Sequence, residues 1–268
     1  MNESLLLEKK VFLFDLDGCI YHGHRASTRA AELIAFLRGE NKQIRFITNN
    51  STDNAIDIQD RLLNMGIQVA TEEIITATDY IGLYLKERFG EIKVKVVGSI
   101  GLKKSIIHHG HVVLDDFSHE RAEVIIIGRD VTFCYEKLKM VVNEEKRGAI
   151  ILGTNMDAAH PGLNGEIVPE TGSLIAAIET ITSNPIMTFG KPSPYLFTYG
   201  MESCDVKASE CVMIGDNYDT DVVGAMSLGI SSVWLTDVSI NALKYEASDT
   251  IKKIVKFKSI EDFYMAVR

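Results

Sequence analysis

Cysteine is scarce in this sequence of 268 residues. Its four cysteines, Cys19, Cys134, Cys204 and Cys211, show neither CxxC spacing nor the density of a disulfide-rich domain. This excludes a disulfide framework and favours a reducing, cytoplasmic location.

Basic residues and long apolar runs are also lacking. Lys and Arg number 28 against 37 Asp and Glu, which gives a net charge of −9. This balance argues against a nucleic-acid polymer or an anionic membrane as the main partner, and it means that an anionic substrate needs a local cation or metal. No apolar run approaches the length of a membrane span, and the first ten residues do not form a secretory signal.

What the sequence does contain is an alternation of short apolar runs with helical patterns. Residues 11–16 and 44–48 are strand-like, and residues 27–40, with Ser27 as the expected N-cap, and 51–65 have helical spacing. Further apolar runs occur at residues 94–97, 124–127, 150–152, 212–214 and 233–235. This order predicts an α/β fold with a parallel sheet.

Functional residues of open α/β sheets collect at the carboxyl ends of strands. Four clusters of polar residues have this place in the sequence: Asp15-Leu16-Asp17-Gly18, Thr48-Asn49-Asn50, Gly190-Lys191-Pro192, and Gly215-Asp216-Asn217 with Asp221 further on.

Each cluster has an ordinary structural explanation beside a functional one. Asp15 and Asp17 flank Leu16, so in a strand both carboxylates point the same way and need a cation or a proton between them. The same residues could simply form a turn. Thr48 could cap a helix or, with exposed amide groups, hold a phosphate.

The two later clusters leave the same choice open. Lys191, held between Gly190 and Pro192, is either a solvated surface charge or a counter-charge for a carboxylate and a phosphate oxygen. The acids from Asp216 to Asp221 either favour the dipole of a following helix or provide the hard oxygen ligands that Mg²⁺ prefers.

Taken together and in this order, the four clusters resemble the haloacid dehalogenase superfamily of phosphatases. In detail the chain is similar to the NagD and 4-nitrophenylphosphatase-like branch (class IIA, with a C2-type cap). The resembling segments are FDLDGCIYHG (14–23), FITNNS (46–51), TNMDAAHP (154–161), TGSLIAAIE (171–179), GKPSPYLF (190–197) and MIGDNYDTDVVGA (213–225).

The resemblance implies roles for the residues in these clusters. Asp15 would attack phosphorus and form an aspartyl-phosphate, and Asp17 would act as general acid and then general base. Thr48, with Asn49 and Asn50 beside it, would hold the phosphoryl group. Lys191 would balance the negative charge. Mg²⁺ would be held by four residues: Asp15, Asp17 through its carbonyl, Asp216, and Asp221 in support.

The resemblance also implies a Rossmann-like, doubly wound core of residues 1–88 and 184–268, with a smaller α/β cap of residues 89–183 inserted in it. Such a cap excludes water and contacts the leaving group, and Asn155, Asp157 and His160 are the expected contacts. The substrate would be a small phosphorylated metabolite: a sugar phosphate, phosphoglycolate, a nucleotide, pyridoxal phosphate or 4-nitrophenyl phosphate. The resemblance also implies a homodimer formed through the cap, since proteins of this branch commonly dimerise in this way.

Other functions remain open on the same residues. A phosphotransferase or mutase would share the core, and a dehalogenase would share the nucleophile but needs neither metal nor general acid. A phospho-receiver or a binding protein is the non-enzyme alternative. The His108-His109-Gly110-His111 segment indicates either a helix C-terminus or a transition-metal site.

Overall fold

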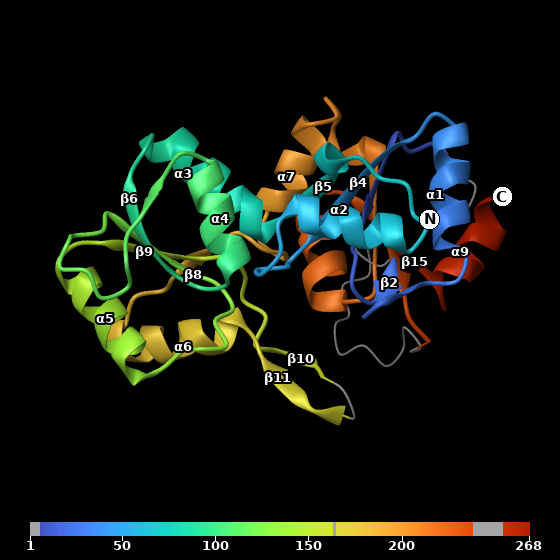
Figure 1. The fold of residues 1–268 in the computed structure, drawn as a ribbon. Coiled ribbons are helices and arrows are strands. Elements are labelled where there is room, and N and C mark those ends of the chain that lie inside the picture. The colour runs from blue at the N-terminus through green and yellow to red at the C-terminus, as the bar shows by residue number, and fades with distance from the viewer. Residues whose placement is uncertain (1–5, 163–164, 238–253) are drawn as a thin grey trace. The chain divides into compact units, whose positions relative to one another are not determined.

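The computed structural model describes residues 6–162, 165–237 and 254–268, and it confirms the α/β fold class (Figure 1). The chain forms two compact units. Unit 1 comprises Met1–Thr48, Ile56–Ile75 and Lys191–Arg268, and unit 2 comprises Asn49–Ala55 and Thr76–Gly190. Most of unit 2 is therefore one long insertion in the sequence of unit 1.

Unit 1 is built on a six-stranded sheet. Its strands, in order across the sheet, are β15 (Ile254–Phe257), β14 (Ser231–Leu235), β13 (Cys211–Gly215), β1 (Val11–Phe14), β4 (Gln43–Thr48) and β5 (Ile74–Thr76). The pairs from β15 through β4 are parallel. All four residues of β1 are buried, as expected for a central strand that is covered on both faces.

The helices of unit 1 follow its strands. They are α1 (Ala30–Gly39), α2 (Ala55–Asn64), α7 (Tyr195–Glu202), α8 (Val223–Ser227), which continues a π-turn at Tyr218–Val222, and α9 (Ile260–Val267). Helices α1 and α9 lie side by side, with the rings of Phe36 and Tyr264 6.0 Å apart (Figure 1). A short hairpin of β2 (Tyr21–His22) and β3 (Arg25–Ala26) follows β1.

Unit 2 has a parallel sheet of its own. Its strands, in order, are β12 (Met187–Thr188), β9 (Ile150–Gly153), β8 (Val124–Ile127), β6 (Lys93–Val97) and β7 (Val112–Val113). Helices α3 (Ala77–Phe89) and α4 (Ile100–His108) lie on one side of this sheet, and α5 (Tyr135–Lys146) and α6 (Thr171–Thr182) on the other (Figure 1). A hairpin of β10 (Ala159–Pro161) and β11 (Ile167–Pro169) precedes α6.

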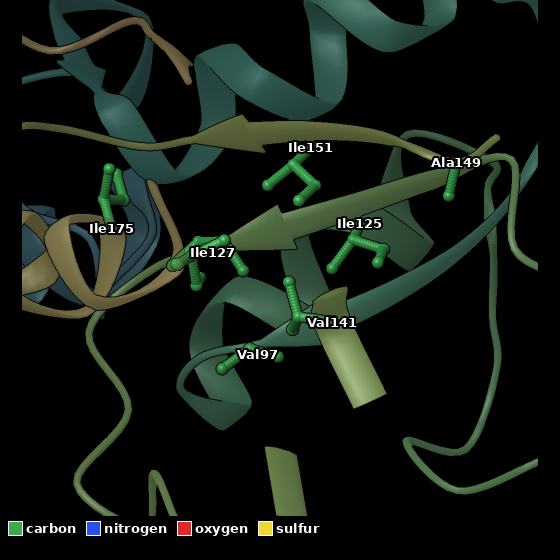
Figure 2. Packing of buried hydrophobic residues seen from close by; sticks show 8 residues of the cluster. Val97, Ile125, Ile127, Val141, Ala149, Ile151 and Ile175 are labelled. Atoms are coloured by element: carbon green, nitrogen blue, oxygen red, sulfur yellow. The ribbon is translucent and has the colours of Figure 1, made fainter. Parts of the chain in front are cut away.

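The core of unit 2 follows from the alternation of side chains along its strands. Ile125 and Ile127 of β8 lie on the same side of the strand as Val141 of α5, and all three are fully buried (Figure 2). Ile151 of β9 and Ile175 of α6 belong to the same cluster. A strand buried on both faces needs such a continuous β-branched run, which explains the VIII sequence of β8.

The apolar runs identified in the sequence all contribute to strands, but both predicted helices begin later than expected, α1 at Ala30 and α2 at Ala55. Ser27 does not cap α1, because the N-cap residue is Arg29, with φ +65° and no side-chain cap. The Ser27 hydroxyl instead donates to the carbonyl of Cys19 at 2.6 Å. A serine hydroxyl can hydrogen-bond to a nearby backbone group as readily as to the first amides of a helix. Here it bonds to a carbonyl in the turn before the helix.

The histidine segment is the predicted helix C-terminus. Helix α4 ends at His108 with His109 as its C-cap, and Gly110 follows with φ +92°. His111 is buried, and its Nε2 lies 3.0 Å from the carbonyl of Gly82. Among the described residues, the one group of acids, cysteines and histidines arranged to hold a metal does not include these histidines.

Unit 2 is broader than the predicted cap range of 89–183, since it also contains α3 and residues 49–55. The assignment of residues 89–183 as a cap over a catalytic face stays a prediction. In the part of the chain that the structure describes, no helix is long and apolar enough to span a membrane.

Candidate active site

The carboxyl ends of three neighbouring strands meet in the middle of the unit 1 sheet. Phe14, the last residue of β1, pairs with Phe46 of β4 on one side and Ile214 of β13 on the other. Asp15 directly follows β1, and its amide donates to the carbonyl of Ile214 at 2.9 Å. Because these strands are parallel, the residues that follow them emerge at one edge of the sheet.

Three carboxylates and one ammonium group form a cluster at this edge, in which all members except Asp216 are buried. Asp15, Asp216 and Asp221 each offer a carboxylate oxygen within 4.8 Å of the others. Lys191 forms ion pairs with both Asp15 and Asp221, with 2.7 Å between its Nζ and Oδ1 of Asp221. Only 2% of the Lys191 side chain is exposed, so this lysine is a counter-charge and not a solvated surface group.

Asp221 is fully buried, and hydrogen bonds fix its carboxylate. Its Oδ1 accepts from the Thr220 hydroxyl at 3.3 Å, and its Oδ2 accepts from the Asn217 amide at 3.1 Å. The Asn217 side chain caps the turn by accepting from the amides of Asp219 and Thr220. Asp219 itself is exposed and lies outside the carboxylate cluster. Asp216 and Asp221 therefore belong to the cluster, whereas Asp219 only lies at the start of the following helix.

Asp216 is the exposed member of the cluster. Its backbone carbonyl accepts a hydrogen bond from the Trp234 indole at 2.9 Å. Its carboxylate packs against Gly18, where an added Cβ would lie 2.3 Å from Oδ2. Gly18 also has φ +90°, so both the backbone conformation and the close approach require glycine here.

The charges of this cluster do not cancel. Burial raises the pKa of Asp15; the Lys191 ammonium opposes the shift and Asp221 adds to it. Desolvation raises the pKa of Asp216, and the Asp221 charge adds to that effect. Burial lowers the pKa of Lys191, but Asp15 and Asp221 outweigh it, so the net shift is upward and the lysine stays charged. Three acids therefore share one cation, which leaves room for further positive charge.

The donor set fits magnesium in chemical terms. Mg²⁺ prefers hard oxygen ligands and is usually bound by one or two carboxylates together with water and phosphate oxygens. Asp15 and Asp216 provide such oxygens at an edge that is open to solvent on the Asp216 side. Asp221 is already occupied by Lys191 and two further donors, which suits a supporting role.

The remaining predicted residues of the core lie at the same strand ends. Thr48 is the last residue of β4 and is buried, whereas Asp17 is exposed. Cys19, two residues after Asp17, is 1% exposed, and burial raises the pKa of its thiol well above its usual value. The Cys19 side chain is therefore part of the packing beneath the carboxylate cluster.

The strand that precedes Lys191 belongs to the other sheet. Residues 186–189 contribute to β12, which pairs with β9 in the sheet of unit 2. Lys191 lies three residues after β12 and begins the return of the chain to unit 1. Its ammonium still reaches Asp15, because the short loop before α7 carries it there.

Unit 2 brings three of the predicted substrate contacts together. Asn49 and Asn155 both donate to Oδ2 of Asp157, at 2.9 and 2.7 Å. Asn155 is 2% exposed, and its Oδ1 accepts from the Thr154 hydroxyl at 2.9 Å. Asn155 therefore orients Asp157, and Asp157 is the more accessible of the two.

The other two predicted contacts have different surroundings. Asn50 forms a turn, with its Oδ1 accepting from the amides of Thr52 and Asp53, which is the ordinary structural explanation for this residue. His160 lies in β10, where its Nδ1 is 2.7 Å from Oε1 of Glu170.

Two residues near His160 were missed in the sequence. Arg129 follows β8, and Glu170 is the N-cap residue of α6. Their side chains approach to 3.5 Å between Arg129 Nε and Glu170 Oε1. The Gly128-Arg129-Asp130 sequence directly after an apolar run is a strand-end signal of the kind that led to Asp15, and it could have identified Arg129.

Replacing Gly18 by Ala is expected to displace the Asp216 carboxylate and to weaken any binding of Mg²⁺ at this cluster by about tenfold or more. The matched control is Gly23→Ala, which shares the left-handed backbone (φ +58°) but has nothing within 4 Å of the added Cβ. The dissociation constant of Mg²⁺, measured by titration calorimetry, separates the two variants. An equal shift in both would show that backbone strain, and not contact with Asp216, is responsible.

Comparisons with known proteins agree with this geometry. Residues 12–111 match the haloacid dehalogenase-like hydrolase family, and residues 188–252 match a second family of the same superfamily, described as HAD-hydrolase-like. An acid sugar phosphatase from Staphylococcus saprophyticus is 28% identical over 95% of this chain and 93% of its own. The solved structure of a 4-nitrophenylphosphatase from Thermotoga maritima superposes with a TM-score of 0.88 at 28% identity, covering 98% of this chain and 99% of that one. A putative NagD protein gives a TM-score of 0.83 at 28% identity, with 96% and 97% covered.

The chain belongs to the haloacid dehalogenase-like hydrolases. Within them it is a phosphoric monoester hydrolase of the NagD and 4-nitrophenylphosphatase-like branch. The dehalogenase, receiver and binding-protein alternatives have no support from these relatives.

Proposed function

We propose that the protein is a Mg²⁺-dependent phosphatase that hydrolyses small phosphate monoesters through an aspartyl-phosphate on Asp15. The observation that carries the proposal is the cluster in which Lys191 pairs with Asp15 and Asp221 while Asp216 lies within reach of both acids. A buried carboxylate with a fixed counter-charge is suited to attack an anionic phosphate, because the ammonium offsets part of the repulsion.

The reaction then proceeds in two displacements at phosphorus. A carboxylate oxygen of Asp15 forms a bond to phosphorus as the bond to the leaving-group oxygen breaks, and Asp17 donates a proton to that oxygen. A water molecule then attacks the same phosphorus, Asp17 accepts its proton, and phosphate departs with Asp15 restored. The exposure of Asp17 supports this role, since it must exchange protons with solvent.

Other groups hold the phosphoryl group and its charge. Thr48, at the end of the neighbouring strand, would contact the phosphoryl oxygens together with Asn49 and Asn50. Asp15, the carbonyl of Asp17 and Asp216 would hold Mg²⁺, with Asp221 positioning Lys191 beside them. When bound, Mg²⁺ would draw the phosphate to the acids and stabilise the charge of the transition state.

Unit 2 would act as the cap that covers the catalytic edge, excludes water and contacts the leaving group through Asp157 and His160. The predicted range of the cap is 89–183. A homodimer through this cap is a further proposal that rests on the resemblance to the NagD-like branch, and a cytoplasmic location is one that rests on the cysteine content of the sequence.

The candidate substrates are those of the similar proteins and of the branch. Relatives are described as acid sugar phosphatases and 4-nitrophenylphosphatases, which supports a sugar phosphate or an aryl phosphate as substrate. Phosphoglycolate, a nucleotide or pyridoxal phosphate would fit the same core.

Phosphate release from p-nitrophenyl phosphate by the pure protein tests this proposal, in Mg²⁺ and in excess chelator. Hydrolysis that requires Mg²⁺ is expected. An absence of release in both conditions, or equal rates in both, would contradict it.

Binding of Mg²⁺ is also expected to stabilise the folded protein, because the three acids repel one another less around a divalent cation. At a free Mg²⁺ concentration about 100 times the dissociation constant, the free energy of unfolding should rise by about 2.7 kcal/mol. Thermal unfolding of the chelator-treated protein, with and without added Mg²⁺, measures this shift. Asp216→Asn should abolish most of it and Asp219→Asn should retain it; the opposite pattern would place the metal elsewhere.

A further inference from the structure

A second group of charged side chains lies at the carboxyl edge of the unit 2 sheet. Ile127 of β8 pairs with Gly153 of β9, so the residues after these parallel strands emerge next to each other. Arg129 follows the first strand and Asn155 the second. Asp157 is tied to Asn155 at 2.7 Å.

The hairpin before α6 adds two more members to this edge. His160 pairs with Val168 in the hairpin, and the Glu170 amide donates to the carbonyl of Ala158 at 2.9 Å. Oε1 of Glu170 thereby lies 2.7 Å from Nδ1 of His160 and 3.5 Å from Nε of Arg129. One carboxylate thus positions a guanidinium and an imidazole.

Arg129 is only partly satisfied in this arrangement. Its Nε is buried and has no hydrogen-bond partner among the described residues, and the distance to Glu170 is that of an ion pair without a hydrogen bond. The side chain is still 28% exposed, so part of the guanidinium reaches solvent. The nitrogens in the exposed part of the guanidinium are the donors from which a ligand oxygen can accept hydrogen bonds.

The combination of one guanidinium with two carboxylates indicates which leaving groups could bind at this edge of the unit 2 sheet. Arg129 donates hydrogen bonds, while Asp157 and Glu170 accept them, and each hydroxyl of a polyol can do both. A carboxylate or phosphate in the leaving group would meet two carboxylates for one guanidinium and would be repelled by the pair. A flat leaving group without hydroxyls would leave these polar groups unused.

We infer that Arg129 is a specificity-determining residue, positioned by Glu170, that selects phosphate esters with a polyhydroxylated leaving group such as a sugar or polyol. The inference rests on the proposed function, in which unit 2 covers the catalytic edge. It adds Arg129 and Glu170 to the leaving-group contacts and narrows the substrate class to hydroxylated esters.

The test compares two kinds of substrate in the same enzyme. The kcat/KM values for glucose 6-phosphate and glycerol 3-phosphate are divided by the value for p-nitrophenyl phosphate, whose leaving group has no further hydroxyls. Arg129→Met should lower this ratio by about 10- to 100-fold, as expected for loss of hydrogen bonds from a charged donor. Arg88→Met, an exposed arginine of α3, is the matched control and should leave the ratio unchanged.

Further variants separate positioning from folding. Glu170→Gln keeps the size of the side chain but loosens Arg129, so KM for the sugar phosphate should rise more than kcat falls. Arg129→Lys keeps the positive charge but lacks the planar guanidinium group, so the ratio should lie between those of wild type and Arg129→Met. This variant provides the test if Arg129→Met lowers the melting temperature of the protein.

The outcomes distinguish this inference from the proposed function. A wild-type enzyme without activity on any of these esters would overturn the proposed function. An active enzyme whose ratio is the same in Arg129→Met and in wild type, or that prefers phosphoglycolate to the hydroxylated esters, would overturn the inference alone.

Discussion

Asp15→Asn is expected to lower kcat for p-nitrophenyl phosphate by roughly four orders of magnitude or more, the range found when a nucleophile that acts within a unit is removed. The neutral amide cannot attack phosphorus at a useful rate, and Lys191 would lose one of its two carboxylate partners. The fold of β1 should survive, because the substituted side chain is the same size and lies after the strand.

The control for this variant is Asp219→Asn. Asp219 is also an aspartate of unit 1, but it is exposed and lies outside the carboxylate cluster. Its kcat should stay within a few-fold of wild type. An Asp15→Asn enzyme that is folded and as active as the control would rule out Asp15 as the nucleophile.

Lys191→Met is expected to impair both activity and stability. Removing one partner of a buried ion pair leaves the other charge uncompensated, which typically costs about 3–5 kcal/mol of unfolding free energy. Here two acids lose their partner, and Asp15 and Asp221 are both buried. Denaturant unfolding in chelator measures the loss, and phosphate release measures the accompanying fall in kcat.

The pH dependence of this loss has a definite sign. The folded-state pKa of Asp15 is already raised, and loss of the ammonium raises it further. A carboxyl with a raised folded-state pKa binds its proton more tightly when folded, so stability falls as the pH rises from the ordinary carboxyl range toward that raised value. In wild type this fall ends near the Asp15 pKa of about 8, whereas in the variant it continues to the higher value, so the destabilisation by Lys191→Met should be larger at pH 9 than at pH 5.

Lys10→Met is the matched control for the lysine. Lys10 also pairs with an acid, Glu210, at 2.6 Å, but 66% of its side chain is exposed. Exposed pairs contribute little, so the unfolding free energy should hardly change. Equal losses in both variants would mean that the buried position of Lys191 has no special energetic role.

The core of the site could be predicted because strand ends can be recognised locally. Asp15, Thr48 and Asp216 each follow or end an apolar run, and in a parallel sheet such residues converge whatever the details of packing. Lys191 was identified from its flanking Gly and Pro, although the strand before it belongs to the other sheet. Sequence periodicity reveals a strand but carries no information on its partner.

The residues that were missed depend on tertiary contacts. Glu170 reaches Arg129 because a hairpin folds back between them, and no spacing in the sequence encodes that approach. Ser27 was taken as a cap because its type and place fit one, yet the carbonyl of Cys19 competes for the hydroxyl. Residue type narrows the choices at such positions, and packing decides among them.

Trapping the covalent intermediate tests the central claim most directly. The enzyme is mixed with substrate and Mg²⁺, quenched in acid during turnover and reduced with borohydride, which converts an aspartyl-phosphate to homoserine. Peptide mass spectrometry should then find homoserine at position 15 in wild type and none in Asp15→Asn. Homoserine at a different aspartate, or none during active turnover, would contradict the assignment of Asp15 as the nucleophile.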